Sequence, residues 1–136
     1  MKISQDLSWI LEDLVANAPG ARHAVLLSAD GMRRGATSGM DADLADTISA
    51  GMSGLQSLSR ATARFAGPTD SPQWQQTVIE FRHGWIFLIA AGNGAYLAVA
   101  AAPEVDIQDI TFRMHQLVAR LGRELVTPLR EMAGEQ

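Results

Sequence analysis

Residues 84–99 read Gly-Trp-Ile-Phe-Leu-Ile-Ala-Ala-Gly-Asn-Gly-Ala-Tyr-Leu-Ala-Val, within a stretch from Gly84 to Pro103 that carries no charged residue. A charge-free run of this length could be mistaken for a membrane span, but Gly92-Asn93-Gly94 divides it into two runs of strand length. We therefore expect a buried hairpin. Because its first strand, Trp85 to Ala91, is apolar on both alternating faces, we expect that strand to be central in a sheet covered on both sides. The second strand is expected over Ala95 to Ala101.

Strand character extends to both sides of this hairpin. Trp74 to Arg82 joins it at His83-Gly84 and mixes apolar with polar residues, as an edge strand does. Earlier in the chain, Arg22 to Ser28 and Met32 to Thr37 flank Asp30-Gly31, a two-residue hairpin signal. The sequence thus predicts a block of two strands and a block of three, and periodicity leaves open how the blocks join.

Three segments show the spacing of amphipathic helices. The first begins near Leu7, with Ser4 as its cap, and stops at Pro19-Gly20. The second runs from about Asp41 to Phe65, roughly 37 Å, and should overhang strands of about 23 Å; a loop over residues 69–72 follows it. The third is capped by Asp106 and is ended or bent by Pro128. The stripes expected to face the sheet are Leu7, Ile10, Leu11, Leu14 and Val15; Leu44, Ile48, Met52, Leu55, Leu58, Ala61 and Phe65; and Ile107, Ile110, Met114, Leu117, Val118, Leu121 and Leu125.

This order of elements predicts an α+β fold. A sheet that is apolar on both faces needs cover on both, and three amphipathic helices are available. We expect a three-layer α/β/α sandwich with a five-stranded antiparallel sheet, one long helix on one face and two helices on the other. Residues 1–136 are expected to form one domain, since a chain of this length buries a sufficient core without disulfides or metals.

Composition excludes several classes of function. The chain has no cysteine, which removes disulfides, thiolate metal sites and cysteine nucleophiles and agrees with a cytoplasmic location. The N-terminal residues do not form the apolar run of a secretory signal. A net charge of -4 argues against a general nucleic-acid binder or an anionic-membrane binder. We expect no nucleic-acid partner and no direct membrane insertion.

Catalytic motifs are not found at the required spacing. Gly51-Met52-Ser53-Gly54-Leu55 lacks the spacing of a hydrolase elbow, and no Gly-Lys pair is present for a phosphate-binding loop. A dinucleotide fingerprint starting at Gly92 would need glycine where Leu97 stands. The three histidines, His23, His83 and His115, have no second ligand at the spacing of a zinc site. The sequence predicts no catalytic residue, no cofactor and no metal.

The second helix has an unusual polar side. It is rich in small residues, and it includes Gly51 and Gly54, each of which costs about 1 kcal/mol relative to alanine inside a helix. Small residues let another helix approach closely, but a merely tolerated serine-rich surface explains the feature equally well. The residues on this side are Asp46, Ser49, Ser53, Gln56, Ser57, Arg60 and Arg64.

Taken in order, these features resemble the roadblock/dynein light-chain family, whose fold is profilin-like. The resemblance covers nearly the whole chain and rests on the combination of short motifs rather than on any one of them. Within this family, the sequence most resembles the bacterial members that are encoded in actinobacterial signalling operons. The motifs are Pro19-Gly20-Ala21, Ser28-Ala29-Asp30-Gly31-Met32, the small-residue-rich second helix and the hairpin of residues 84–99.

The resemblance implies a non-catalytic homodimer that binds a small Ras-like GTPase, with a sensor-kinase-like protein as a further possible partner. The dimer surface that it implies comprises Gly51, Gly54, Ser57, Thr77, Val78 and Ile79. The partner-binding residues that it implies are Ser49, Ser53, Gln56, Arg60 and Arg64. Two alternatives stay open: a module that senses a small ligand between sheet and helix, and a purely structural adaptor subunit.

Overall fold

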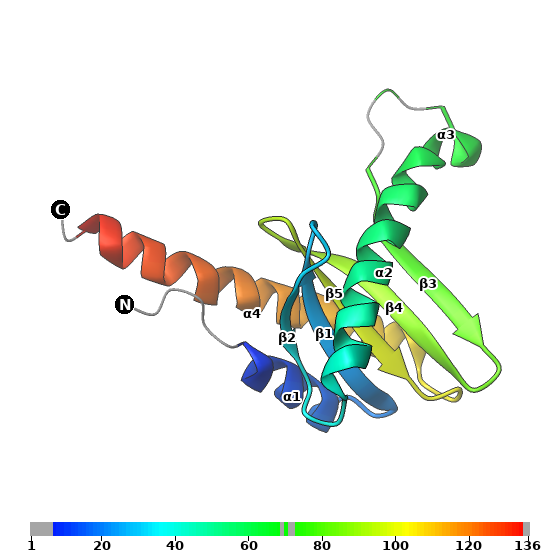
Figure 1. Ribbon diagram of the computed structural model, residues 1–136, viewed down its shortest axis with the longest axis horizontal. Helices are drawn as coiled ribbons and strands as arrows, with labels where there is room; N and C mark the ends of the chain where they lie inside the picture. The colour runs from blue at the N-terminus through cyan, green and yellow to red at the C-terminus, as the bar shows by residue number, and fades with distance from the viewer. Residues whose placement is uncertain (1–6, 69, 71–72, 135–136) are drawn as a thin grey trace.

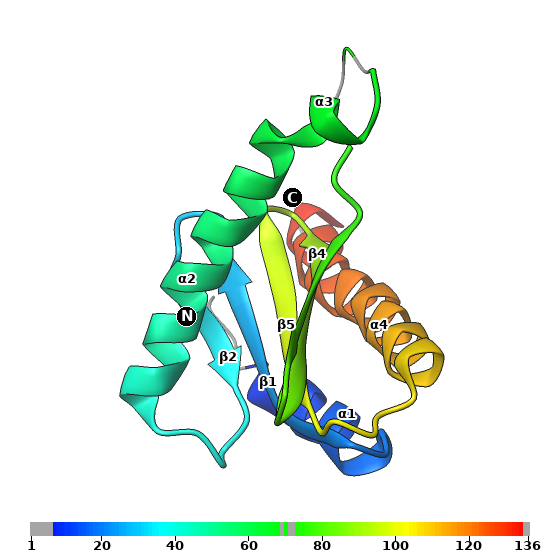
Figure 2. The same ribbon diagram turned by 90° about the vertical axis from the view of Figure 1, so that its right-hand side faces the viewer.

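A computed structural model describes residues 7–68, 70 and 73–134, with side chains described through Arg123. The elements are, in order, α1 (Ser8–Asn17), β1 (Ala21–Ser28), β2 (Arg33–Ala36), α2 (Ala42–Ala61), α3 (Ala63–Ala66), β3 (Gln76–Phe81), β4 (Gly84–Gly92), β5 (Ala95–Ala101) and α4 (Ile107–Gly134). Figures 1 and 2 show α2 on one face of the sheet and α1 and α4 on the other. The predicted three-layer sandwich is confirmed.

The five strands form one antiparallel sheet in the order β2-β1-β5-β4-β3. β1 and β5 join the two blocks, with Leu26 opposite Leu97 and Ala24 opposite Val99. As predicted, β4 is an inner strand, flanked by β5 and β3, and β3 is an outer strand. Gly84 lets β4 start close to β5, because a Cβ atom there would lie 2.7 Å from the carbonyl oxygen of Ala101.

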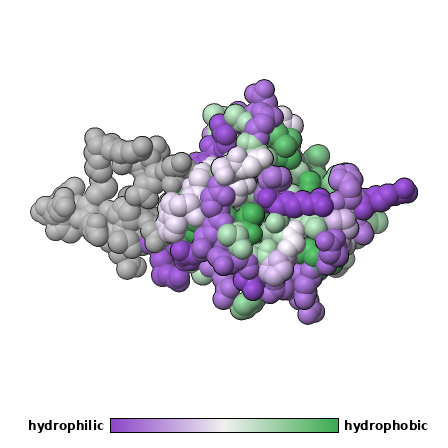
Figure 3. All heavy atoms as spheres, turned by 90° about the horizontal axis from the view of Figure 1, so that it is seen from below, coloured by the Kyte–Doolittle hydropathy of each residue, from purple (hydrophilic) through white to green (hydrophobic). Residues whose placement is uncertain are grey.

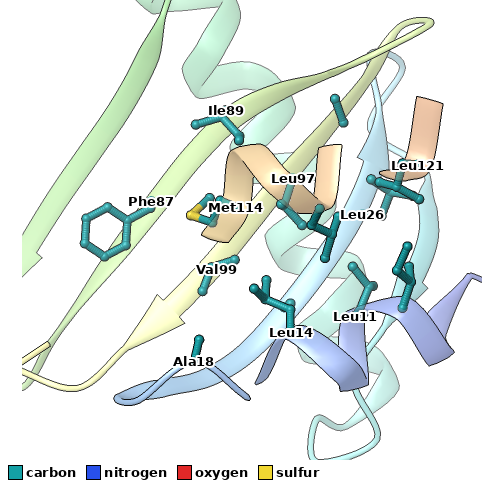
Figure 4. Packing of buried hydrophobic residues seen from close by; sticks show 14 of the residues in the cluster. Leu11, Leu14, Ala18, Leu26, Phe87, Ile89, Leu97, Val99, Met114 and Leu121 are labelled. Carbon is teal, nitrogen blue, oxygen red and sulfur yellow. The ribbon is translucent and has the colours of Figure 1, made fainter. Parts of the chain in front are cut away.

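The larger core lies between the sheet and the helices α1 and α4. Figure 4 shows Leu11 and Leu14 of α1 and Met114 of α4 converging on strand residues such as Phe87 and Leu97. These side chains leave 7% or less of their surface exposed. Because large aliphatic and aromatic groups fill this space, this face of the sheet supplies most of the apolar burial that stabilises the fold.

The second helix is shorter than predicted. Asp41 caps α2, its side chain accepting a hydrogen bond from the Asp43 N–H, but the helix ends at Ala61. Thr62 adopts φ −101° and ψ 9°, which separates α2 from the single turn of α3. The predicted overhang is nevertheless present: in Figure 1 the last turns of α2 and all of α3 extend beyond the sheet.

The β1–β2 turn also differs from the expectation of a two-residue loop. The Ser28 N–H donates to the Met32 carbonyl and the Gly31 N–H donates to the Ser28 carbonyl, which makes a three-residue loop. Gly31 has φ +86°, a conformation that favours glycine. The Asp30 carboxylate accepts a hydrogen bond from the Ser28 hydroxyl, and this bond lowers the pKa of Asp30.

The last helix keeps its predicted cap, since the Asp106 carboxylate accepts from the Asp109 N–H at 3.1 Å. It runs through Pro128 to Gly134, so Pro128 does not end it, and the alternative that Pro128 bends it stays a prediction. Ile107, placed in the buried stripe, is 42% exposed because it lies in the first turn. Three expectations lie wholly or partly outside the described residues: the Ser4 cap, the side chain of Leu125, and the loop of residues 69–72, of which only residue 70 is described.

Candidate interaction surface on α2 and β3

The face that α2 turns to its own sheet is only partly the predicted one, since Met52 is buried there and Ile48 and Leu55 pack at its margin. Its buried residues are Ala45, Ser49, Met52 and Gln56. The predicted stripe contributes only Met52 to this set, because the helix is rotated so that small and polar residues contact the sheet. Three large residues of that stripe are at the surface: Leu44 is 46%, Leu58 is 67% and Phe65 is 98% exposed.

The displaced apolar residues form a continuous line along α2 and α3, which we name the α2 seam. Its members alternate in steps of four and three residues, the spacing by which two helices pack side by side. Leu44, Gly51 and Leu58 are exposed, whereas Ile48 and Leu55 are half-buried. The α2 seam consists of Leu44, Ile48, Gly51, Leu55, Leu58, Thr62 and Phe65.

The α2 seam lies on the side of the helix that faces β3. Ile48 and Leu55 pack against the same cluster as Ile79 of β3 and Ile86 of β4. Nearby, the hydroxyls of Ser59 and Thr77 lie 3.4 Å apart. In Figure 1, α2 crosses in front of the β1–β2 side of the sheet, and β3 lies to its right. The seam and the outer strand therefore border the same part of the surface.

The opposite flank of α2 is tied to the β1–β2 hairpin. The Ser53 hydroxyl donates to the Ala29 carbonyl at 2.6 Å. Arg33 and Asp46 form an ion pair at 3.1 Å, with both side chains exposed. This flank is therefore occupied by the chain itself, whereas the seam flank is not.

The two helical glycines have no packing role within the chain. A Cβ atom built on Gly51 or on Gly54 would meet nothing within 4 Å. Each glycine still weakens the helix by about 1 kcal/mol relative to alanine. Close approach of a second molecule would account for a glycine here, and Gly51 lies on the α2 seam.

The predicted dimer residues divide between two flanks and the sheet edge. Gly51 lies on the seam, Gly54 on the outer ridge, and Ser57 one turn beyond Ser53 on the hairpin flank. Thr77 and Ile79 are half-buried on the α2 side of β3. Val78 lies on the other face of the sheet and is 39% exposed. All three β3 residues lie along the outer edge.

The predicted partner-binding residues need two corrections. Ser49 is fully buried and donates to the Ala45 carbonyl at 2.9 Å. Gln56 is 6% exposed. Both side chains point at the sheet beneath α2, so the prediction that they contact a partner is wrong. The helical period alone groups Ser49 and Gln56 with other polar residues of α2. Only the orientation of α2 on the sheet shows that these two side chains face inward.

The other three predicted partner residues are accessible. Arg60 is exposed, and its guanidinium donates to the Tyr96 hydroxyl at 3.3 Å, which holds it near the end of the sheet. Arg64 is exposed on α3, beyond the sheet. Ser53 is half-buried and already donates to Ala29. Two arginines thus stand at the overhanging end of the helix.

Other kinds of site are poorly developed in the described part of the chain. No group of three or more acidic, histidine or cysteine side chains is placed to hold a metal among the described residues. Nor does any described helix have the length and apolarity to cross a membrane. A groove of about 460 Å³ runs between α1 and α4, and the ion pair of Arg120 and Asp13 at 2.8 Å lines it. It is a surface groove rather than a cavity between sheet and helix.

Apolar residues elsewhere on the surface are more scattered. Figure 3 views the molecule from below Figure 1 and shows apolar residues interspersed with hydrophilic ones. Such a mixture is ordinary for a protein surface. A spaced line of apolar residues beside an outer strand is not, and it makes α2 and β3 the leading interaction surface.

Comparison with known proteins identifies the class of this fold. The family model of the Roadblock/LC7 domain matches residues 7–101. A Roadblock/LC7 domain from Streptomyces avermitilis is 36% identical, covers 90% of this chain and 100% of its own, and superposes with a TM-score of 0.82. This chain belongs to the Roadblock/LC7 family.

More distant structures share the fold. The gliding protein MglB from Thermus thermophilus is 17% identical, with a TM-score of 0.71 over 85% of this chain and 84% of its own. A profilin from Schizosaccharomyces pombe is 12% identical, with a TM-score of 0.62 over 84% and 94%. Among curated proteins, none matches this chain in sequence. The predicted family and profilin-like architecture are confirmed.

Sequence reasoning missed the surface role of Leu44, Leu58 and Phe65. The available signal was the steps of four and three along the α2 seam with Gly51 among its members. A second set at positions 45, 49, 52 and 56 has the same spacing. Apolarity favoured the first set as the core, and only the packed structure shows that the second set faces the sheet.

Proposed function

We propose that the protein is a cytoplasmic, non-catalytic homodimer that binds a small Ras-like GTPase in a bacterial signalling system and modulates its nucleotide cycle or its placement. Family membership supports the regulatory class. The observation that carries the proposal is the exposed α2 seam beside the outer edge of β3, because both leave apolar or hydrogen-bonding groups that a second copy would cover.

The dimer that fits this surface has a two-fold axis beside β3. Two copies of β3 pair antiparallel, which joins the two sheets, and the two α2 helices lie side by side in opposite directions. A register that uses the whole seam places Gly51 opposite Leu58 of the other copy and Leu44 opposite Phe65. Gly51 then leaves room for Leu58 at the centre of the interface, and Leu44 and Phe65 cover each other at its two ends.

Cysteine pairs can test this register directly, since the natural chain contains no cysteine. Leu55→Cys, close to the axis, should cross-link to itself under mild oxidation. Leu44→Cys alone should not cross-link, but a mixture of Leu44→Cys and Phe65→Cys chains should. Asp46→Cys, on the hairpin flank, serves as the control. If Leu44→Cys chains, and likewise Leu58→Cys chains, cross-linked efficiently to themselves, the helices would be parallel and the register would be contradicted.

The GTPase would contact the outer side of the paired helices, where Arg60 and Arg64 supply positive charge. Long-range attraction to an acidic partner surface speeds association and weakens with salt. The sequence carries no catalytic motif at the required spacing, so we expect the dimer to show no hydrolase or nucleotidase activity alone. Any change in GTP hydrolysis should therefore require the GTPase.

Calorimetry with a small Ras-like GTPase of the same organism, in its GDP and GTP-analogue forms, tests this function. Different affinities for the two forms are expected of a regulator. Equal affinities would favour the structural adaptor, and no binding to either form would contradict the proposal. The sensor alternative lacks support from a buried cavity, because Phe87 and its stacked neighbour Trp85, 5.9 Å apart, occupy the space between sheet and α4.

A further inference from the structure

The layer formed by α2 and α3 is packed differently from the rest of the molecule. We infer that this layer docks firmly on its own sheet only when a second copy covers the α2 seam. Dimerisation would then order the helix that carries the proposed GTPase contacts, in addition to bringing two copies of that helix together. The inference rests on the proposed dimer, but its test does not require the GTPase.

Apolar cover beneath α2 is thin. Among the described residues, the buried cluster on this face comprises Val25, Leu27, Met52, Leu88, Tyr96 and Ala98. Met52 alone comes from α2, with Ile48 and Leu55 packed against the cluster at half-burial. The opposite cluster buries three large residues of α1 and four of α4: Ile10, Leu11 and Leu14; Ile110, Met114, Leu117 and Leu121.

Two of the four buried α2 side chains are polar. The Ser49 hydroxyl is satisfied by the Ala45 carbonyl of its own helix, so it adds no tie to the sheet. The Oε1 atom of Gln56 is buried and accepts no hydrogen bond from the described residues. A buried carbonyl oxygen without a donor favours states in which water reaches it, and displacement of α2 is such a state.

The remaining ties of α2 to the sheet are weak or lie at its margin. The ion pair of Arg33 and Asp46 is 38% and 61% exposed, and pairs so exposed add little stability. The Ser59–Thr77 contact is long, at 3.4 Å. Gly51 and Gly54 lower the intrinsic stability of the helix itself. The bond from the Arg60 guanidinium to the Tyr96 hydroxyl is 3.3 Å long, and only the Ser53–Ala29 bond, at 2.6 Å, is short.

A second copy would reverse this balance. Leu44, Leu58 and Phe65, the most exposed large residues of the layer, would lose water contact when the second copy packs against the α2 seam. Their burial stabilises α2 only in its docked position, because a helix displaced from its sheet no longer places these residues against the second copy. Local opening of α2 should therefore depend on protein concentration, while opening of the sheet should not.

Hydrogen exchange read by mass spectrometry distinguishes the two layers. Leu58→Glu removes a side chain that has no role in the core and should produce a monomer, verified by light scattering. In that monomer we expect amides of residues 45–61 to exchange at least about tenfold faster than in the natural dimer. Amides of β1, β5 and α4 should be unchanged. Phe112→Glu is the matched control, because Phe112 of α4 is 61% exposed and Leu58 is 67% exposed. It should change neither the oligomeric state nor the exchange of the α2 amides.

A second variant tests the physical cause. Gln56→Met keeps a similar volume and removes the unpaired carbonyl, so Leu58→Glu/Gln56→Met should regain most of the α2 protection while remaining monomeric. A monomer whose α2 is as protected as in the dimer would overturn the inference and leave the dimer proposal standing. Equal loss of protection in β1 and β5 would also overturn it. A Leu58→Glu chain that stays dimeric would overturn both the seam and the inference.

Discussion

The two outer strands of the sheet, β2 and β3, are finished in different ways. Helix α1 closes the β2 edge: the Ser8 hydroxyl accepts a hydrogen bond from the Ala36 N–H at 3.2 Å, and the Glu12 carboxylate accepts from the Ser38 N–H at 2.6 Å. Along β3, no described side chain bonds to the outward backbone groups. One edge is therefore protected against strand addition and the other is left available.

The open edge marks the side of the sheet on which a second copy can add. Backbone groups on an open edge pair readily with another strand, so proteins usually cover them, twist them away or place charges on them. Here the uncovered edge borders the α2 seam, and the covered edge borders the flank of α2 that is tied to the hairpin by Ser53. Backbone and side chains thus agree on a single side for a second copy.

Among changes that test the contrast between the two edges, removing one outward donor from the open edge should have the largest effect. Phe81 and Gly84 close the β3–β4 hairpin, and pairs alternate from there, so the Val78 N–H points away from β4. Val78→Pro should weaken the dimer roughly thirtyfold, because two symmetry-related hydrogen bonds of about 1 kcal/mol each are lost. Analytical ultracentrifugation measures the change. Arg34→Pro, on the β2 edge, is the control, and equal weakening there would remove the contrast.

A smaller effect is expected from the two glycines of α2. Gly51→Leu places a bulky group on the seam and should weaken the dimer about tenfold by overpacking against the other copy. Gly54→Leu, on the outer ridge, gains the same helix propensity and should leave dimer affinity within about threefold. Dilution measurements on both variants compare them directly. A stronger effect at Gly54 would move the interface onto the outer ridge.

Opening the closed edge should affect stability rather than the dimer. Ser8→Ala deprives the Ala36 N–H of its acceptor and should lower the free energy of unfolding by about 1 kcal/mol. Denaturant titration measures the loss. The exposed β2 edge should then also support species larger than the dimer in size-exclusion chromatography at high concentration. An unchanged unfolding midpoint would show that the cap contributes nothing.

The smallest expected effect is a pH dependence at the β1–β2 turn, beside the closed edge. The Ser28 hydroxyl, the Met32 N–H and the charge of Arg34 hold the pKa of Asp30 below its usual value of 3.8. A lowered pKa stabilises the folded turn above pH 3.8, and this contribution is lost as the pH falls through the folded value. An NMR titration of Asp30 should show the pKa rising toward its usual value in Ser28→Ala. No difference between the two proteins would refute the assignment.

Much of the fold could be predicted because the relevant signals are local. The hairpin of residues 84–99 carries its own turn and two apolar strands, and Asp41 and Asp106 cap helices within a few residues of themselves. The same holds for the outer position of β3, which its mixed polarity indicates. The interaction surface was less predictable, because Gly51 lies on α2 and Thr77 and Ile79 lie on β3. These segments are distant in sequence and form one surface only in the folded chain.

The sequence alone predicted the order of five strands and three amphipathic helices, the antiparallel pairing of neighbouring strands, the three layers and the family, but not the division of the second helix into α2 and α3. The tertiary structure alone decided that β1 pairs with β5, that α1 caps β2, and that α2 turns Ser49 and Gln56 inward and Leu58 outward. The physical reason is that helical periodicity defines stripes but not their destination. An apolar stripe can be removed from water either by its own sheet or by a second copy of the chain, and the packing of the whole chain selects between these two.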